Sequence, residues 1–506
     1  MAHWNKTSSV PIPVMRLNLT SNSGQALWLA IANFVSFSFG IVSAAILSRF
    51  LSVEEYGSYK QVLYIYSTLL TVFTLGLPRA YSFFLARLPI EEGKSAVNRI
   101  NGIFLLLGTV FSLTLFFGSS IIASILKNPD LTILLKWFSP TPLFLLPVMG
   151  LESIMATYRK ASYATIYVVL SRLFTLACVV IPVLIWGGSK VAVIGFSVAS
   201  ILCFIVGIAL ERKPFKGVSK NKSSLRLREV IIYSLPLLFI NLTSILEKAA
   251  PQFYISRYWG VSEFAEFSNG YIELPFATMV IGAVSTVLLP LFSRLSNNVI
   301  ETKEIIRLWN SSFEKSVDVI YPLSIFCFFF AKDIITFLYG DNYLGAVTYF
   351  QIIIVCTLTR IVPYGPIIMA LNKNRQYLLI QSLTTVAVWS ACGAYIIIGG
   401  NNPYVIAIIA TIITILYLFS LLAIVSNSLK VRIKQLIPFV MIFKTLALSC
   451  ISCFMAFIIL YNLNLNSFIS IIIGACIFFI CFVTISLIFN IPNYIINNLL
   501  HKLKNL

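Results

Sequence analysis

The sequence predicts an all-α membrane protein with about fourteen transmembrane helices. Three observations lead to this class: an apolar composition, long hydrophobic blocks and an internal repeat. Of the 506 residues, 58% are hydrophobic and 11% are charged, whereas a soluble domain carries about 25% charged residues. The hydrophobic blocks are about 20 residues or longer, which is enough to cross roughly 30 Å of hydrocarbon.

In chain order, the hydrophobic blocks form two groups of six helices and a final pair. The first six cover residues 25–48, 58–86, 101–126, 132–157, 162–186 and 191–210. The next six cover residues 230–256, 263–293, 308–331, 345–371, 377–398 and 404–425. The final pair covers residues 436–461 and 466–490. The predicted parts of the chain are an N-terminal segment 1–24, an N-lobe 25–210, a basic linker 211–229, a C-lobe 230–425, an appended helix pair within 426–490 and a tail 491–506.

The formal net charge of +19 raises the alternative of nucleic-acid binding, but the positions of the charges favour a topological explanation. If the N-terminus is cytoplasmic, 24 of the 37 Lys and Arg residues fall in inner segments, seven in outer segments and six within predicted spans. Inner loops of membrane proteins carry an excess of Lys and Arg. We therefore expect both termini in the cytoplasm and no nucleic-acid partner. In this topology Arg49, Lys60 and Arg257 belong to outer segments.

The sequence predicts neither an enzymatic activity nor a cofactor. The polar stretch 211–229 is far shorter than the roughly 50 residues of the smallest independent domain, and there is no GxxxxGK[ST] phosphate loop. The only histidines are His3 and His501. Cys450 and Cys453 form a CxxC inside an apolar span, and we interpret them as small packing residues because zinc would need further Cys or His ligands.

Two sequence matches reveal an internal repeat. Residues 48–56 (SRFLSVEEY) align without gaps to residues 256–264 (SRYWGVSEF), 208 positions later. Residues 154–163 match residues 368–377, 214 positions later. The first match closes the first helix of each half and the second closes the fourth. Because six helices separate the copies, the two lobes have the same orientation and are related by an axis along the membrane normal.

Parallel six-helix lobes typically enclose a site near the bilayer midplane and work by rocking against each other. The repeat therefore predicts a transporter rather than a channel or a membrane enzyme. The final two helices have no counterpart in the repeat, so they are predicted to be an appendage.

Three segments resemble polysaccharide exporters of the multidrug/oligosaccharidyl-lipid/polysaccharide (MOP) superfamily. They are LSRFLSVEEYGSYKQ (47–61), LGLPRAYSFFLAR (75–87) and FLYGDNYLGAVTYFQII (337–353). The resemblance implies a Wzx-like O-antigen or capsule flippase that moves undecaprenyl-diphosphate-linked oligosaccharides across the bacterial inner membrane. It also implies twelve core helices, often with two more, and no enzymatic activity. The expected partners are this substrate, membrane lipids and the polysaccharide polymerase machinery, with the protein itself a monomer.

Ionisable side chains at bilayer depth are costly unless they face a wet cavity or a partner, so each is a candidate functional residue. Arg and Lys suit phosphate oxygens. The candidate substrate-binding residues are Arg79, Arg172, Lys248, Lys315 and Arg360. At about 1.5 Å per residue, Arg172 lies near the midplane, whereas Arg79 and Lys315 lie closer to the inner side. The structural alternative is that some of these cations only form static ion pairs.

The candidate ion-coupling residues are Glu247, Glu273 and Asp318. A buried carboxylate can exchange protons as its environment changes between two access states. Lys248 and Glu273 fall at similar depth on consecutive predicted helices, so they could form a buried pair. Static pairing of the carboxylates with Lys248 or Lys315 is the alternative to coupling.

Other functions are compatible with parts of the pattern. A multidrug or cation antiporter and a lipid II flippase belong to the same superfamily, although Arg79 and Arg172 against the single carboxylate Glu152 in the N-lobe favour an anionic substrate. A glycosyltransferase, polymerase or ligase would need a large outer loop, which the predicted connections do not provide. A major-facilitator transporter shares the layout, but the loop 87–101 lacks that family's GxxxDRxGRR signature.

Overall fold

The computed structural model describes residues 22–219, 221–295, 302–461, 463 and 465–489. Within these residues the protein is built from helices and contains no strand, which confirms the predicted all-α class. Most of the predicted N-terminal segment and the whole predicted C-terminal tail lie outside the described residues.

The helices of the N-terminal half are α1 (Asn22–Phe50), α2 (Val53–Thr74), α3 (Pro78–Leu85), α4 (Ile90–Leu126), α5 (Leu131–Phe138), α6 (Pro140–Leu145), α7 (Leu151–Thr157), α8 (Ala161–Trp186) and α9 (Ser189–Glu211). The C-terminal half contains α10 (Leu227–Tyr258), α11 (Gly260–Gly270), α12 (Pro275–Leu295), α13 (Thr302–Phe329), α14 (Ala331–Tyr339), α15 (Ala346–Thr359), α16 (Tyr364–Ala370), α17 (Asn374–Ile397) and α18 (Pro403–Leu429). The short α19 (Ile433–Leu436), α20 (Phe439–Tyr461) and α21 (Ser467–Ile488) follow.

Eleven helical segments among the described residues are long and apolar enough to cross a membrane. A twelfth results if α13 and α14, which are bent by 75° to each other, count as one span. These twelve correspond to predicted spans, and the two other predicted spans, 230–256 and 263–293, contain α10, α11 and α12. The chain is therefore a multi-pass membrane protein.

Four predicted spans are not continuous helices, and a proline marks each break. Proline lacks an N–H and clashes with the preceding turn inside a helix, but it suits the first helical position. The predicted helices 58–86, 132–157, 263–293 and 345–371 are broken at Pro78, Pro140, Pro275 and Pro363. The single-helix predictions for these spans were wrong. The broken spans are the second and fourth of each predicted lobe.

The start of α2 also differs from the prediction. Ser52 Oγ accepts a hydrogen bond from the Glu55 backbone N–H (3.2 Å), and Glu55 Oε2 accepts one from the Ser52 N–H (3.0 Å). This capping box satisfies two N–H groups at the helix start and fixes it at Val53 instead of residue 58. Lys60, which the predicted topology counted with the outer segments, lies within α2.

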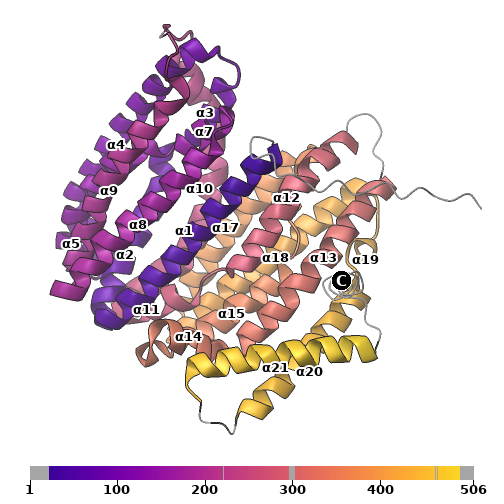
Figure 1. Cartoon of the computed structure of the whole chain (residues 1–506). Helices are drawn as coiled ribbons and strands as arrows, with labels where there is room; N and C mark the ends of the chain where they lie inside the picture. Colours follow the sequence, from indigo (N-terminus) through magenta and orange to yellow (C-terminus); the bar gives the residue numbers. More distant parts are fainter. Residues whose placement is uncertain (1–21, 220, 296–301, 462, 464, 490–506) are drawn as a thin grey trace, which may run out of the picture.

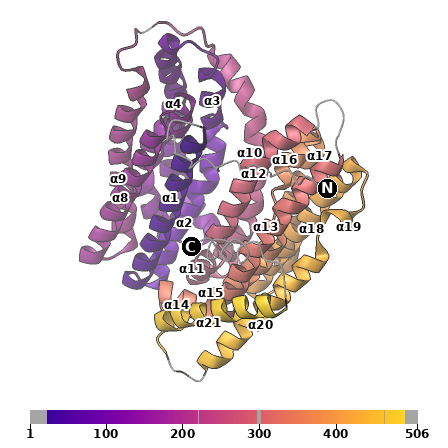
Figure 2. The same cartoon turned by 45° about the vertical axis from the view of Figure 1, so that its right-hand side comes forward.

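The two halves meet at one end of the molecule and diverge toward the other (Figures 1 and 2). At the closed end α2 packs against α10 and α11, and α1 contacts α14. The appended helices α20 and α21, shown in yellow, pack against α13 and α14 (Figure 1). The appended pair therefore sits on the C-terminal half.

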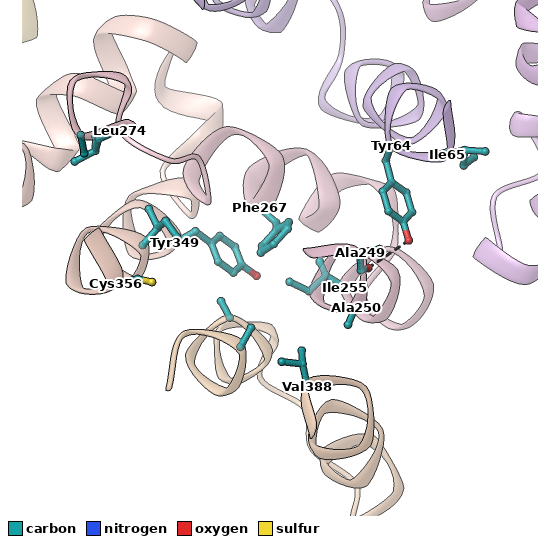
Figure 3. Close-up of a cluster of buried hydrophobic side chains, with 14 of the residues drawn as sticks. Tyr64, Ile65, Ala249, Ala250, Ile255, Phe267, Leu274, Tyr349, Cys356 and Val388 are labelled. Carbon is teal, nitrogen blue, oxygen red and sulfur yellow. Dashed lines mark hydrogen bonds between the residues drawn. The ribbon is translucent and has the colours of Figure 1, made fainter. Parts of the chain in front are cut away.

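Buried side chains join the halves in one hydrophobic core (Figure 3). Tyr64 of α2 reaches toward α10, where its hydroxyl donates to the Ala249 carbonyl oxygen (3.3 Å). On the neighbouring helices, the rings of Phe267 and Tyr349 meet edge to face at 5.2 Å. The core thus continues from α2 through α10 and α11 to α15.

Polar side chains reinforce the closed end. Tyr56 Oη donates to Asn269 Oδ1 (2.7 Å), and Gln61 Nε2 donates to Ser256 Oγ (2.7 Å). All four side chains are buried. Buried hydrogen bonds of this kind are costly to break without replacement partners, so they hold the halves together at this end.

The repeated Ser-Arg dipeptides also contact the opposite half. The Arg49 guanidinium donates to the Phe337 carbonyl oxygen on α14. The Arg257 guanidinium donates to the Ile125 carbonyl oxygen near the end of α4. Equivalent positions of the repeat thus make reciprocal bonds between the halves.

Candidate functional site

A cavity of about 840 Å³ lies mainly within the C-terminal half. Its walls come from α10, α11, α12, α15, α16, α17 and α18, and α2 contributes the wall on the side of the N-terminal half. The charged side chains that line it are Lys60, Glu247, Lys248, Glu273 and Arg360. Three cations face two carboxylates, so the lining has a net positive formal charge.

Lys248, Glu273 and Arg360 form what we call the ionic centre. Lys248 Nζ lies 2.8 Å from Glu273 Oε1, and an Arg360 terminal nitrogen lies 3.0 Å from the same oxygen. The side chains are 54%, 37% and 45% exposed for Lys248, Glu273 and Arg360. The predicted Lys248–Glu273 pair is confirmed, but it faces the cavity instead of being buried, and Arg360 joins it.

Two residues of the ionic centre lie at helix breaks. Glu273 lies in the non-helical residues 271–274 between α11 and α12, and Arg360 caps the end of α15 before Pro363 starts the turn into α16. Non-helical backbone at membrane depth is tolerated where it is buried in protein or lines a water-filled cavity. The helix breaks at Pro275 and Pro363 thus lie next to Glu273 and Arg360, two charged side chains that line the cavity.

Glu247 has neutral partners. Gln381 Nε2 donates to its Oε2 (2.5 Å), and the Thr414 hydroxyl shares its single hydrogen between Glu247 Oε1 (3.2 Å) and the Ala410 carbonyl oxygen (2.9 Å). We call Glu247, Gln381 and Thr414 the polar cluster. The three side chains come from α10, α17 and α18 and all line the cavity.

The other predicted site residues are not brought to this cavity. Arg79 on α3 and Arg172 on α8 are exposed, and Glu152 lies within electrostatic range of Arg172. On α13, Lys315 is exposed and Asp318 is 2% exposed. None of these side chains lines the cavity.

Sequence reasoning missed Lys60, Gln381, Thr414 and the cavity tyrosines Tyr377 and Tyr417. The predicted span 58–86 already contained Lys60, and a charged side chain within a span is itself a signal for a functional residue. The neutral residues carry no comparable signal in a single apolar span. In the part of the chain that the structure describes, no group of three or more His, Cys, Asp or Glu residues could hold a metal ion.

A family model described as polysaccharide biosynthesis protein matches residues 24–296, which is more than half of the chain. No curated protein sequence matches the chain. Several solved structures share its fold.

The lipid II flippase MurJ in an inward closed conformation has a TM-score of 0.67 and 19% identity, covering 91% of this chain and 99% of its own. A MOP superfamily transporter from Pyrococcus furiosus has a TM-score of 0.57 and 11% identity, covering 82% of this chain and 98% of its own. The MATE transporter VcmN from Vibrio cholerae in its bent form has a TM-score of 0.53 and 13% identity, covering 80% of this chain and 95% of its own. The chain has the fold of these transporters.

Proposed function

The chain belongs to the polysaccharide biosynthesis protein family, and we propose that it is a flippase for undecaprenyl-diphosphate-linked oligosaccharide, such as an O-antigen or capsule repeat unit. It would move this lipid across a bacterial inner membrane by alternating access. The partners in this proposal are the lipid-linked substrate, membrane lipids and polysaccharide polymerase machinery, and the protein works as a monomer.

The ionic centre is the main support for this substrate. A diphosphate carries several anionic oxygens, and Arg and Lys bind such oxygens through charge-assisted hydrogen bonds. Glu273 holds Lys248 and Arg360 on one carboxylate oxygen, so the two cations are already close together. Lys60 adds a third cation from α2, on the side of the other half.

The proposed topology makes this conformation inward-facing. Both termini are placed in the cytoplasm, so the loops around Arg159, Lys160 and Lys373 are cytoplasmic. The end at which the halves are bonded together is then the outer end. The substrate would enter the cavity from the inner leaflet and leave after the outer end opens.

Energy coupling is assigned to carboxylates. Glu273 is a candidate because its carboxylate pairs with both Lys248 and Arg360. Asp318 is a candidate because its side chain is buried within α13. Glu247, the third candidate from the sequence, accepts hydrogen bonds from uncharged side chains. Arg79, Arg172 and Lys315 lie outside the cavity in this conformation. We propose that they contact the substrate in another conformation of the transport cycle.

Deletion of the gene in the producing bacterium tests the proposal. We expect surface polysaccharide to disappear and complete lipid-linked repeat units to accumulate on the cytoplasmic side, with both effects reversed by the wild-type gene. An Arg79→Ala gene in the same strain tests the assigned contact of that residue.

Two other outcomes would replace the proposal. Intact surface polymer with new sensitivity to cationic drugs would indicate an antiporter. Intact polymer with a failure of peptidoglycan synthesis would indicate a lipid II flippase, like the structurally similar MurJ.

A further inference from the structure

The polar cluster lies in the same cavity as the ionic centre but differs from it in chemistry. Its carboxylate, Glu247, makes no salt bridge among the described residues and is held by the Gln381 amide and the Thr414 hydroxyl. Uncharged donors do not neutralise the carboxylate. Polar groups inside a membrane protein are costly and are usually retained for a function.

The polar cluster has donor and acceptor positions beyond those used in its internal hydrogen bonds. A carboxylate has about four acceptor positions, and Gln381 and Thr414 use one on each oxygen of Glu247. Gln381 also has a carbonyl oxygen and a second N–H. Alternating donors and acceptors of this kind match sugar hydroxyl groups, each of which can donate and accept.

Aromatic side chains adjoin the cluster. Tyr377 and Tyr417 line the cavity, and their side chains lie close to each other. Tyr417 lies within electrostatic range of both Glu247 and Arg360, so it is near both the polar cluster and the ionic centre. An aromatic ring offers an apolar face with a polar tip, which suits the mixed surface of a sugar ring.

The two groups are close enough for one substrate. Glu247 and Lys248 are consecutive on α10, so their side chains leave the helix about 100° apart, and both line the cavity. A diphosphate at the ionic centre would therefore place the first attached sugar beside the polar cluster.

We propose that Glu247, Gln381 and Thr414, with Tyr377 and Tyr417, form a sugar-binding subsite that recognises the hydroxyl groups of the sugar next to the diphosphate. This inference rests on the proposed function and assigns a specificity role to residues on α10, α17 and α18. Glu247 then binds substrate, and energy coupling is left to Glu273 or Asp318.

Binding of two lipid probes to the purified full-length protein tests the subsite. The probes are undecaprenyl diphosphate and undecaprenyl-diphosphate-N-acetylglucosamine. We expect the wild type to bind the sugar-bearing lipid more tightly. Gln381→Leu and Thr414→Val should each weaken its binding by about tenfold, because a hydrogen-bonding group is lost. Binding of the bare diphosphate should stay within about twofold.

Thr384→Val is the matched control. Thr384 lies on α17 three residues from Gln381, bonds to the Ile380 carbonyl and does not line the cavity, so its removal should leave both affinities unchanged. Thermal melting of each variant shows that it is folded. Two separate variants guard against the failure of either one to fold.

The outcomes separate the two proposals. Equal loss of both probes in Gln381→Leu and Thr414→Val, or no preference for the sugar-bearing lipid in the wild type, overturns the subsite. If the wild type binds neither probe, the proposed flippase function fails and the subsite fails with it. If Arg360→Ala leaves both affinities unchanged, the ionic centre does not hold the diphosphate, and the subsite placed beside it is overturned.

Discussion

Replacing Arg360 with alanine is expected to lower transport of the lipid-linked substrate by roughly tenfold or more, since a charge-assisted contact is worth about 1.5–3 kcal/mol. Arg360 donates to Glu273 at 3.0 Å. Without it, Glu273 keeps only Lys248 as a cationic partner, and the cavity loses its net positive charge. Surface polysaccharide and accumulated lipid-linked repeat units in a complemented deletion strain measure the loss.

The control for this prediction is Arg307→Ala. Arg307 is 80% exposed on α13, and its ion pair with Glu304 is 3.6 Å long. It does not line the cavity, and exposed pairs of this kind contribute little. Arg360→Lys keeps the charge but not the planar donor geometry, so it should restore part of the activity. Wild-type transport by Arg360→Ala would remove the ionic centre from the substrate path.

Replacing Gly57 with leucine is expected to prevent the two halves from meeting at the closed end and so to abolish most transport. A Cβ atom at Gly57 would overlap the Val261 carbonyl oxygen and crowd the Val261 side chain. Backbone on α11 cannot move aside as a flexible side chain can, and overpacking costs about 1–3 kcal/mol or more. Surface polysaccharide and the melting temperature of the purified variant measure the effect.

Gly102→Leu is the matched substitution. Gly102 lies on α4, and a Cβ there would meet no atom within 4 Å, so transport and melting temperature should stay near wild type. If folded Gly57→Leu protein transports normally, the contact between α2 and α11 need not form in the transport cycle. A folded variant without transport supports closure of this end as a required step.

Arg49 and Arg257, which are equivalent in the sequence repeat, make equivalent bonds between the two halves. The dipeptide at the end of the first helix of each half reaches a carbonyl oxygen of the other half. The alignment of the two segments could be made from sequence, but their contacts could not. Contacts between halves depend on how separately folded helices pack, and no local pattern encodes that packing.

The helical fold and most of the spans were predictable because long apolar blocks have few alternatives in a bilayer, although at most twelve of the fourteen predicted spans are long and apolar enough to cross a membrane among the described residues. The breaks were partly predictable as well, since Pro78, Pro140, Pro275 and Pro363 are visible in the sequence. A proline in a membrane helix, however, can produce either a kink or a complete break, depending on which neighbouring groups satisfy the freed backbone. Pro182 and Pro322 lie inside continuous helices here.

The sequence predicted the depth of the site residues in the membrane but not the direction in which their side chains point. The rise per residue gives the depth of a charge, which was sufficient to pair Lys248 with Glu273. Depth does not tell which way a side chain faces around the bundle. Arg360 faces the cavity while Arg79 and Arg172 do not line it, and only packing of the helices distinguishes them.

Translocation of undecaprenyl-diphosphate-N-acetylglucosamine in proteoliposomes is the most direct test of the central claim that the cavity carries a lipid-linked sugar. We expect purified wild-type protein to move the lipid from one leaflet to the other, whereas Arg360→Ala protein and protein-free vesicles should not. If the wild-type protein leaves this lipid in its original leaflet but transports a cationic drug, the cavity does not carry a lipid-linked sugar.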